Sequence, residues 1–374
     1  MPSQAKLRRT STLLFSSQEQ GHSIVVIALI MVGVIAMLGL VLDGGNSYLQ
    51  RRRMQNSADG SAIAGVIKLA NPGTLTGRSL ECSIRYEIEK FATLNGVPGP
   101  TPVANCGTYN TNILANFIDS NGNAVGTYVG LHYGVPTTAK GISVTVATTF
   151  GAFFLGVIGM PNGSAAAEAK AAFAPLAAPS SIQPFAIPCS KAVFTDCFTK
   201  GDVKDIYEGS GSGNFGWLSW NGDSDAGYVA NELNPSVNTL SGYIDPHGVC
   251  PNGGIAVSNG GTQCWMEGSS GVSNSSDIGA QMDAWIARGA AGTPMIIPVY
   301  DQCEPIDSKT GQCKTSGGGT NVNYRIKGFA AFILKSYNLS SKRVTGVFVN
   351  TAIPGKLCTS NCFDTGVYGI HLRP

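Results

Sequence analysis

"IVVIALIMVGVIAMLGLVLDGGNSYLQRRRMQNSADGSAIAG" occupies residues 24–65 and decides the fold of this 374-residue chain. Its first part, 24–42, carries no charged side chain. A helix of this length, rising about 1.5 Å per residue, is about 28 Å long and matches the roughly 30 Å hydrocarbon core of a bilayer. The alternative is a cleaved signal peptide, which has a shorter apolar region and a small-residue cleavage site. The sequence therefore predicts a retained transmembrane helix over 24–42, preceded by a short polar tail, 1–23.

The helical pattern continues beyond the apolar run. Within the run, Gly33, Ala36 and Gly39 form a stripe of small residues, which favours close packing against another membrane helix. Over 47–70 a second face combines small and apolar side chains: Ala58, Ala62, Gly65, Val66 and Leu69. Asn71, Pro72 and Gly73 end the pattern. We expect one long helix, half in lipid and half packed on the domain that follows.

Basic residues flank the apolar run on both sides. Lys6, Arg8 and Arg9 precede it, and Arg51, Arg52 and Arg53 follow it more closely. An excess of Lys and Arg marks the cytoplasmic side of a membrane span, but here the two sides roughly balance. These charges therefore leave the orientation open.

The cysteines favour one orientation. All ten follow the apolar run: Cys82, Cys106, Cys189, Cys197, Cys250, Cys264, Cys303, Cys313, Cys358 and Cys362. Disulfides persist outside the cytosol, so this even number predicts a cytoplasmic N-terminus and an extracytoplasmic remainder. Pairing between sequence neighbours is favoured: 82 with 106, 189 with 197, 250 with 264, 303 with 313, and 358 with 362. A zinc site usually needs CxxC pairs, which are absent, so no cofactor is expected.

Composition indicates a turn-rich exterior protein. Charged residues make up 13% of the chain, about half of the usual share, and there are 48 glycines. The net charge of +2 argues against a nucleic-acid partner.

Two domains are expected beyond the span, giving an α+β fold. The first, 43–180, contains the helical extension 47–70, a helix over 80–95 with Leu80, Ile84, Ile88 and Phe91 on one face, and a strand over 141–150. The apolar segment 151–160 is too short to span and is expected in the core or against the anchor helix. Segment 164–181 begins as a strand and ends as a Pro/Ala/Ser linker. The second domain, 181–374, is Gly-rich and Cys-rich, and is expected to be mainly β and disulfide-rich, with a short helix over 281–289.

Catalytic motifs are scarce. The chain has no GxSxG, HExxH or GxxxxGK[ST] pattern, so we expect no enzymatic activity and no catalytic residue. A surface hydrolase is the alternative for the second domain. It would draw on scattered acids: Asp202, Asp205, Glu208, Asp301 and Glu304.

Two loops place oxygen-bearing side chains at alternate positions, as calcium loops do: Asn221, Asp223 and Asp225, and Asp119, Asn121 and Asn123. Both lack the glycine at the sixth position of an EF-hand loop, and ordinary Asx turns explain them better. The aromatics Phe215, Trp217 and Trp220 suit either a contact patch or the core of a charge-poor domain, and the core is favoured.

The segment after the apolar run resembles the TadE/TadG-like proteins of the tight-adherence (Flp) pilus system. Matching residues are Asp43, Gly44, Tyr48, Arg51, Arg52, Arg53, Gln55, Asn56 and Asp59. The resemblance covers about residues 20–175. It implies a pilin-like α+β domain on a membrane anchor, with the cytoplasmic membrane and other Tad/Flp pilus components as partners.

One departure narrows the resemblance. Pilin-like members carry a glutamate five residues after the glycine at which they are processed, but Val26 occupies that place after Gly21. The resemblance then implies a TadG-like, permanently anchored accessory protein of pilus assembly or adhesion. A minor pilin cleaved after Gly21 is the alternative.

Overall fold

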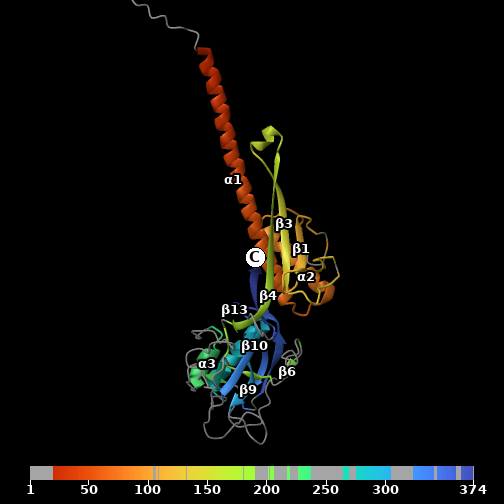
Figure 1. Cartoon of the computed structure of the whole chain (residues 1–374). Helices are drawn as coiled ribbons and strands as arrows, with labels where there is room; N and C mark the ends of the chain where they lie inside the picture. Colours follow the sequence, from red (N-terminus) through yellow and green to blue (C-terminus); the bar gives the residue numbers. More distant parts are fainter. Residues whose placement is uncertain are drawn as a thin grey trace, which may run out of the picture.

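The computed structural model describes residues 20–103, 107, 109–131, 133–179, 181–189, 201, 203–205, 217–219, 226–236, 264–268, 275–304, 323–340, 343–358 and 364–373. It confirms the α+β class, with an apolar N-terminal helix and a β-rich C-terminal region. Figure 1 shows an elongated molecule in which the long helix α1 leads into a first sheet, and a second sheet lies at the far end.

Helix α1, Gln20–Ala70, is continuous over 51 residues and joins the predicted span to its predicted extension. Along 24–42 its large apolar side chains are exposed, and by length and composition this part is able to cross a membrane once. Further along, the helix turns one face to the protein. The buried side chains of that face include the predicted small-residue positions: Ala58, Ala62, Val66 and Leu69.

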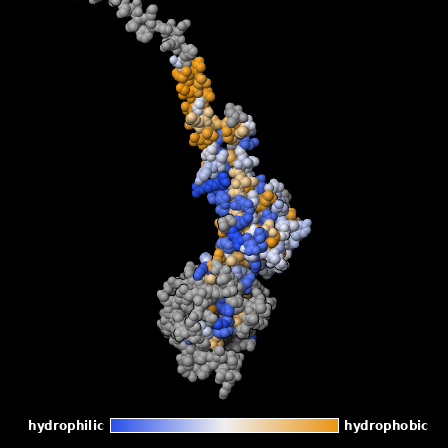
Figure 2. Space-filling model, in the orientation of Figure 1, coloured by the Kyte–Doolittle hydropathy of each residue, from blue (hydrophilic) through white to orange (hydrophobic). Residues whose placement is uncertain are grey.

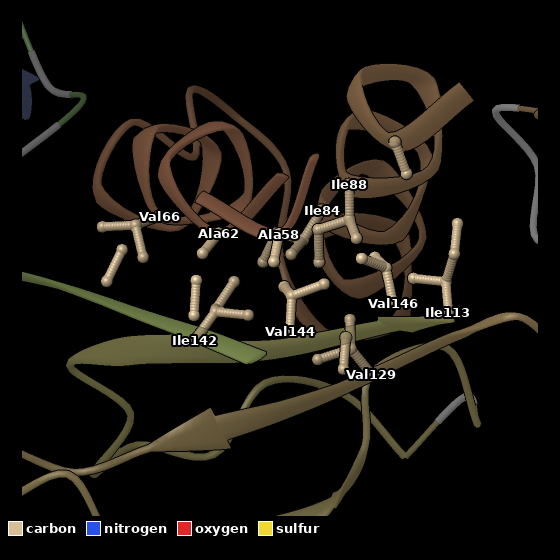
Figure 3. Packing of buried hydrophobic residues seen from close by; sticks show 14 of the residues in the cluster. Ala58, Ala62, Val66, Ile84, Ile88, Ile113, Val129, Ile142, Val144 and Val146 are labelled. Atoms are coloured by element: carbon tan, nitrogen blue, oxygen red, sulfur yellow. The ribbon is translucent and has the colours of Figure 1, made fainter. Parts of the chain in front are cut away.

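The first sheet has the strand order β12-β14-β4-β3-β1-β2, with β13 paired to β4. Its strands are β1 Ile113–Ile118, β2 Ala124–Tyr128, β3 Gly141–Gly151, β4 Asn162–Pro179, β12 Thr351–Ala352, β13 Gly355–Leu357 and β14 Val367–Arg373. Helix α2, Gly77–Leu94, lies beside α1 over one face of this sheet, and the side chains between them form one core (Figure 3).

Helix α2 confirms the predicted helix, with one difference in its buried face. Leu80, Ile84 and Ile88 are buried as expected, whereas Phe91 is 38% exposed and Ala92 is buried instead. A helix turns 100° per residue, so the row that runs 80, 84, 88 continues at 92. Gly96 follows the helix with a φ of 87°, a conformation that suits glycine at a helix end.

Strands β3 and β4 form the longest hairpin of the first sheet. They pair antiparallel from Gly141 with Ala172 to Gly151 with Asn162. This confirms the predicted strand over 141–150. The Pro/Ala end of 164–181, predicted as a linker, is instead strand: β4 runs to Pro179 because β13 pairs with its last residues.

The chain returns to the first sheet at its C-terminal end. Strand β14 pairs antiparallel with β4, from Tyr368 with Pro175 to Arg373 with Lys170. The predicted boundary near residue 180 thus does not separate the strands of the two sheets, although the division into domains itself stays a prediction. The sequence gives no sign of this return, since the pairing partners lie about 200 residues apart.

The second sheet has the order β5-β9-β10-β11-β6, extended by β8 on β10 and β7 on β8. Its strands are β5 Ile187–Pro188, β6 Val203–Asp205, β7 Leu218–Ser219, β8 Cys264–Gly268, β9 Met295–Glu304, β10 Asn323–Asn338 and β11 Arg343–Val349. Helices α3, Ala226–Leu233, and α4, Ser276–Ala290, pack on it through a core that contains Trp285 and Phe332. The predicted helix over 281–289 is therefore the second half of α4. A further core that contains Leu176, Phe329 and Val367 joins the two sheets.

Some of the cysteines are described well enough to test the predicted disulfide bonds. Among the described residues no cysteine is free, and Cys82, Cys189, Cys303 and Cys358 are in disulfide bonds. Their partners are not described, and the side chains of Cys106, Cys197, Cys250, Cys264, Cys313 and Cys362 lie outside the described residues. The neighbour pairing and the disulfide-rich character of the second domain therefore stay predictions.

Gly65 allows α1 to approach α2 and β3. A Cβ atom placed on it would lie 2.8 Å from Cγ1 of Ile88 and 2.9 Å from Cδ1 of Ile142. Gly65→Ala is expected to lower the free energy of unfolding by about 1–3 kcal/mol, because two buried side chains must move. Gly60→Ala is the matched control, since its nearest neighbour would be an ordinary 3.5 Å away. Urea unfolding in detergent compares the two; equal effects would show that close packing at Gly65 is unimportant.

Candidate functional site

The candidate site lies at the end of the apolar run, where α1 meets the loop between β3 and β4. Residues 152–160, here called the hairpin tip, join the two strands and contain the short 3-10 helix η1, Leu155–Ile158. Figure 1 shows the tip rising beside α1, away from the rest of the sheet.

Asp43 fastens the hairpin tip to α1. Its carboxylate accepts three backbone hydrogen bonds, from the N–H of Phe153 at 2.7 Å, of Phe154 at 3.0 Å and of Leu155 at 2.7 Å. The side chain is buried, with 3% of the residue exposed. A carboxylate suits this position because it accepts several hydrogen bonds at once and bears charge opposite to the N–H dipoles at the start of η1.

Two further contacts hold the same junction. A Cβ on Gly39 would lie 2.6 Å from Cβ of Phe154, so the aromatic side chain sits directly against the helix backbone. Three residues beyond Asp43, Asn46 donates from Nδ2 to the carbonyl of Gly151 at 3.4 Å. The segment 151–160 was predicted to pack either in the core or against the anchor helix, and it packs against the helix.

The predicted small-residue stripe divides into two parts. Gly39 is buried and serves a contact within the chain. Gly33 and Ala36 are exposed, and a Cβ on Gly33 would meet nothing within 4 Å. Packing of Gly33 and Ala36 on another membrane helix stays a prediction.

The remaining motif residues lie along the next turns of α1. Gly44, Tyr48, Arg51, Arg52, Arg53, Gln55 and Asn56 are exposed, and Asp59 is half-buried. Arg53 donates from Nε to the carbonyl of Asn95 at 3.3 Å, at the end of α2, and Gln55 donates to Asp59 at 2.8 Å. The motif thus combines one buried anchor, Asp43, with a mainly exposed basic and polar face.

A buried ionic network on α2 escaped the sequence reasoning. Arg85 and Glu89 are 5% and 3% exposed, and the guanidinium lies 2.8 Å from the carboxylate. Arg85 also donates to the carbonyls of Asn110 at 3.1 Å and Ile113 at 3.0 Å, and Glu89 accepts from the N–H of Asn110 at 2.9 Å. The two residues therefore fix the entry into β1. Their spacing of four residues was the available signal, but it is equally common on solvated helix faces.

Glu81, one helical turn before Arg85, holds the loop after β2 in place. Its carboxylate accepts from the N–H of Gly130 at 2.7 Å and of Gly134 at 2.6 Å. The residue is 1% exposed, so α2 supplies buried charges both to the segment before β1 and to the loop after β2.

The calcium candidates have different outcomes. Asn221, Asp223 and Asp225 lie outside the described residues. Asp119 forms an Asx turn, because its Oδ1 accepts from the N–H of Asn121 at 2.8 Å and of Asn123 at 2.9 Å. In the described part of the chain, no group of three or more His, Cys, Asp or Glu side chains is placed to hold a metal ion.

The aromatic segment contributes to the core where it is described. Trp217 is fully buried beside Phe185, with ring centroids 5.2 Å apart. Phe215 and Trp220 lie outside the described residues.

Of the acids considered for hydrolysis, Asp301 has a described environment. Arg325 donates to its two oxygens at 2.7 and 2.6 Å, and Nζ of Lys327 lies 3.3 Å away. Burial raises the pKa of Asp301, but the hydrogen bonds and charges of Arg325 and Lys327 outweigh it and hold the pKa below its usual range. Such a carboxyl remains ionised at neutral pH. The side chains of Asp202, Asp205, Glu208 and Glu304 lie outside the described residues.

Because the pKa of Asp301 is lowered, the contribution of this residue to stability is expected to depend on pH. A carboxyl with a lowered folded-state pKa adds stability above its unfolded pKa of about 3.9, and this is lost as pH falls through the folded value. Asp301→Asn is expected to cost on the order of 1–3 kcal/mol at neutral pH, and the difference from wild type should shrink below about pH 3.9. Urea unfolding across this range measures it. A difference that is constant down to the lowest pH would contradict the ionised pair.

Comparison with known protein families finds a match along α1. Residues 23–68 match a family model described as "Putative Flp pilus-assembly TadE/G-like". Neither the curated proteins nor the solved structures contain a match to this chain. The matched residues coincide with the apolar half and the packed half of α1, and they include Gly39, Asp43 and the three arginines. Residues 23–68 of this chain are thus similar to the Flp pilus-assembly TadE/G-like proteins.

Proposed function

We propose that the chain is a membrane-anchored, non-enzymatic accessory protein of Flp/Tad pilus assembly or surface adhesion, of the TadG-like branch. The observation that carries this is the TadE/G-like match over 23–68, on a helix that is long and apolar enough to anchor the protein. The remainder of the chain, built on two sheets with a pilin-like first part, then presents a surface to other Tad/Flp components.

The proposed orientation places the N-terminus in the cytoplasm and both sheets on the extracytoplasmic side of a bacterial cytoplasmic membrane. Its support is that all ten cysteines follow the span, and that the four whose side chains are described are disulfide-bonded. Disulfides are rare in the cytosol, where thiols are kept reduced. The exposed Arg51, Arg52 and Arg53 then lie roughly 14–17 Å beyond residue 42 along the helix, in reach of lipid headgroups or a partner.

The intact mass of the full-length protein, recovered from membranes and alkylated without reduction, tests this proposal. Full length without alkylated cysteines is the expected result. Loss of residues 1–21 would instead assign the chain to the minor pilins, despite Val26. Alkylation of all ten cysteines would overturn the extracytoplasmic placement. A pull-down from detergent extracts then tests whether other Tad/Flp components are bound. The double variant Arg51→Glu with Arg52→Glu tests whether the exposed basic face contributes to that binding.

A further inference from the structure

The hairpin tip is apolar and exposed, although the strands that it joins contribute to a packed core. Residues 152–160 contain no charged or polar side chain. Phe153 is 71% exposed and Met160 is 61% exposed. In Figure 2 the apolar surface of α1 continues onto the tip beside it.

Contact with α1 sets the depth of the hairpin tip. Phe154 lies against Gly39, which falls within the apolar run 24–42, and Asp43 holds the tip just after that run ends. Each residue of a helix advances about 1.5 Å, so Gly39 lies about 5 Å inside the end of the run. If 24–42 crosses the bilayer, the tip lies at the boundary between acyl chains and headgroups.

Several backbone groups of the hairpin tip form hydrogen bonds within the protein and so do not depend on water. Non-helical backbone enters lipid only at high cost unless its N–H and C=O groups are satisfied within the protein. Asp43 accepts from the N–H of Phe153, Phe154 and Leu155. Ala152 donates to the carbonyl of Pro161 at 2.9 Å, and Met160 to that of Leu155 at 3.0 Å. The buried carboxylate thus meets this requirement for three successive N–H groups of the tip.

We propose that the hairpin tip inserts into the lipid beside α1, as a second membrane contact that fixes how the first sheet stands on the bilayer. The occupant of the exposed surface of Phe153 and Met160 is phospholipid, because that surface is continuous with the lipid-facing side chains of 24–42. The inference rests on the anchoring role proposed for α1. A helix alone would leave the sheet free to tilt and rotate, whereas two adjacent contacts restrict both motions.

Tryptophan quenching in vesicles tests the insertion. Full-length Phe153→Trp, Leu38→Trp and Tyr133→Trp proteins are reconstituted into zwitterionic phospholipid vesicles, with and without bromine on the acyl chain near the headgroup. Leu38 is an exposed residue of the span, and Tyr133 is a residue of the first sheet that is 78% exposed. The fluorescence each variant adds to the wild-type signal, which comes from four tryptophans, is compared between the two lipids.

We expect brominated lipid to quench the added fluorescence of Phe153→Trp and Leu38→Trp, and to leave that of Tyr133→Trp unchanged. Quenching of Leu38→Trp alone would overturn the insertion of the tip and retain the anchor. No quenching at either position would overturn both. Emission from Phe153→Trp that is blue-shifted but not quenched would show a protein on the tip, which also overturns the proposal. Met160→Trp repeats the measurement at a second position in case Phe153→Trp misfolds.

Discussion

Arg85→Met is expected to lower the free energy of unfolding by about 3–5 kcal/mol, a large part of the stability of an ordinary domain. Methionine retains much of the volume of the side chain but leaves the carboxylate of Glu89 buried without its cation. It also deprives the carbonyls of Asn110 and Ile113 of donors. Urea unfolding in detergent, followed by circular dichroism, measures the loss.

A double-mutant cycle separates the unpaired charge from lost packing. Arg85→Met with Glu89→Gln is expected to be less destabilised than Arg85→Met alone, because the buried charge is removed. Lys90→Met is the control on the same helix. Its 3.6 Å pair with Glu87 joins an exposed to a half-buried side chain at the surface, so Lys90→Met should change stability by less than about 1 kcal/mol. Similar losses for Arg85→Met and Lys90→Met would contradict a structural role for the buried pair.

Asp43→Ala is expected to release the hairpin tip while the sheet stays folded. The three N–H groups lose a charged acceptor, so amide hydrogen exchange at Phe153, Phe154 and Leu155 should accelerate on the order of a hundredfold. Val144, in the middle of β3, should keep its exchange rate, because it lies in the paired part of the hairpin.

The control for Asp43→Ala is Asn46→Ala, which removes a single 3.4 Å hydrogen bond to the same loop. Only a slight change at the tip amides is expected, since a bond of that length is weak. If Asp43→Ala leaves the tip amides as protected as in wild type, the carboxylate does not hold the tip. The membrane insertion of the tip would then lack its structural support.

The sequence identified Asp43 as a motif residue, but it did not show that the residue binds the backbone of a distant loop. The residue stood out because it follows the apolar run and matches the TadE/TadG pattern. Its hydrogen-bond partners lie about 110 residues later, in a loop that showed only an apolar character. The same limit applies to Glu81, whose partners Gly130 and Gly134 lie about 50 residues away. A local pattern names a polar residue but does not say whether it is buried or which groups it meets.

The sequence by itself determined the long helix, the buried face of its outer half, the second helix and the strand over 141–150. The uninterrupted apolar run predicts the first part of the long helix, and a local repeat of apolar side chains predicts each of the others. Both kinds of pattern are properties of the chain alone. Only the tertiary structure decided that β14 closes onto β4, that the tip of the β3–β4 hairpin lies on α1, and that Arg85 and Glu89 are buried together. These contacts join segments distant in the chain, and their energy depends on burial and geometry, which no short stretch of residues encodes.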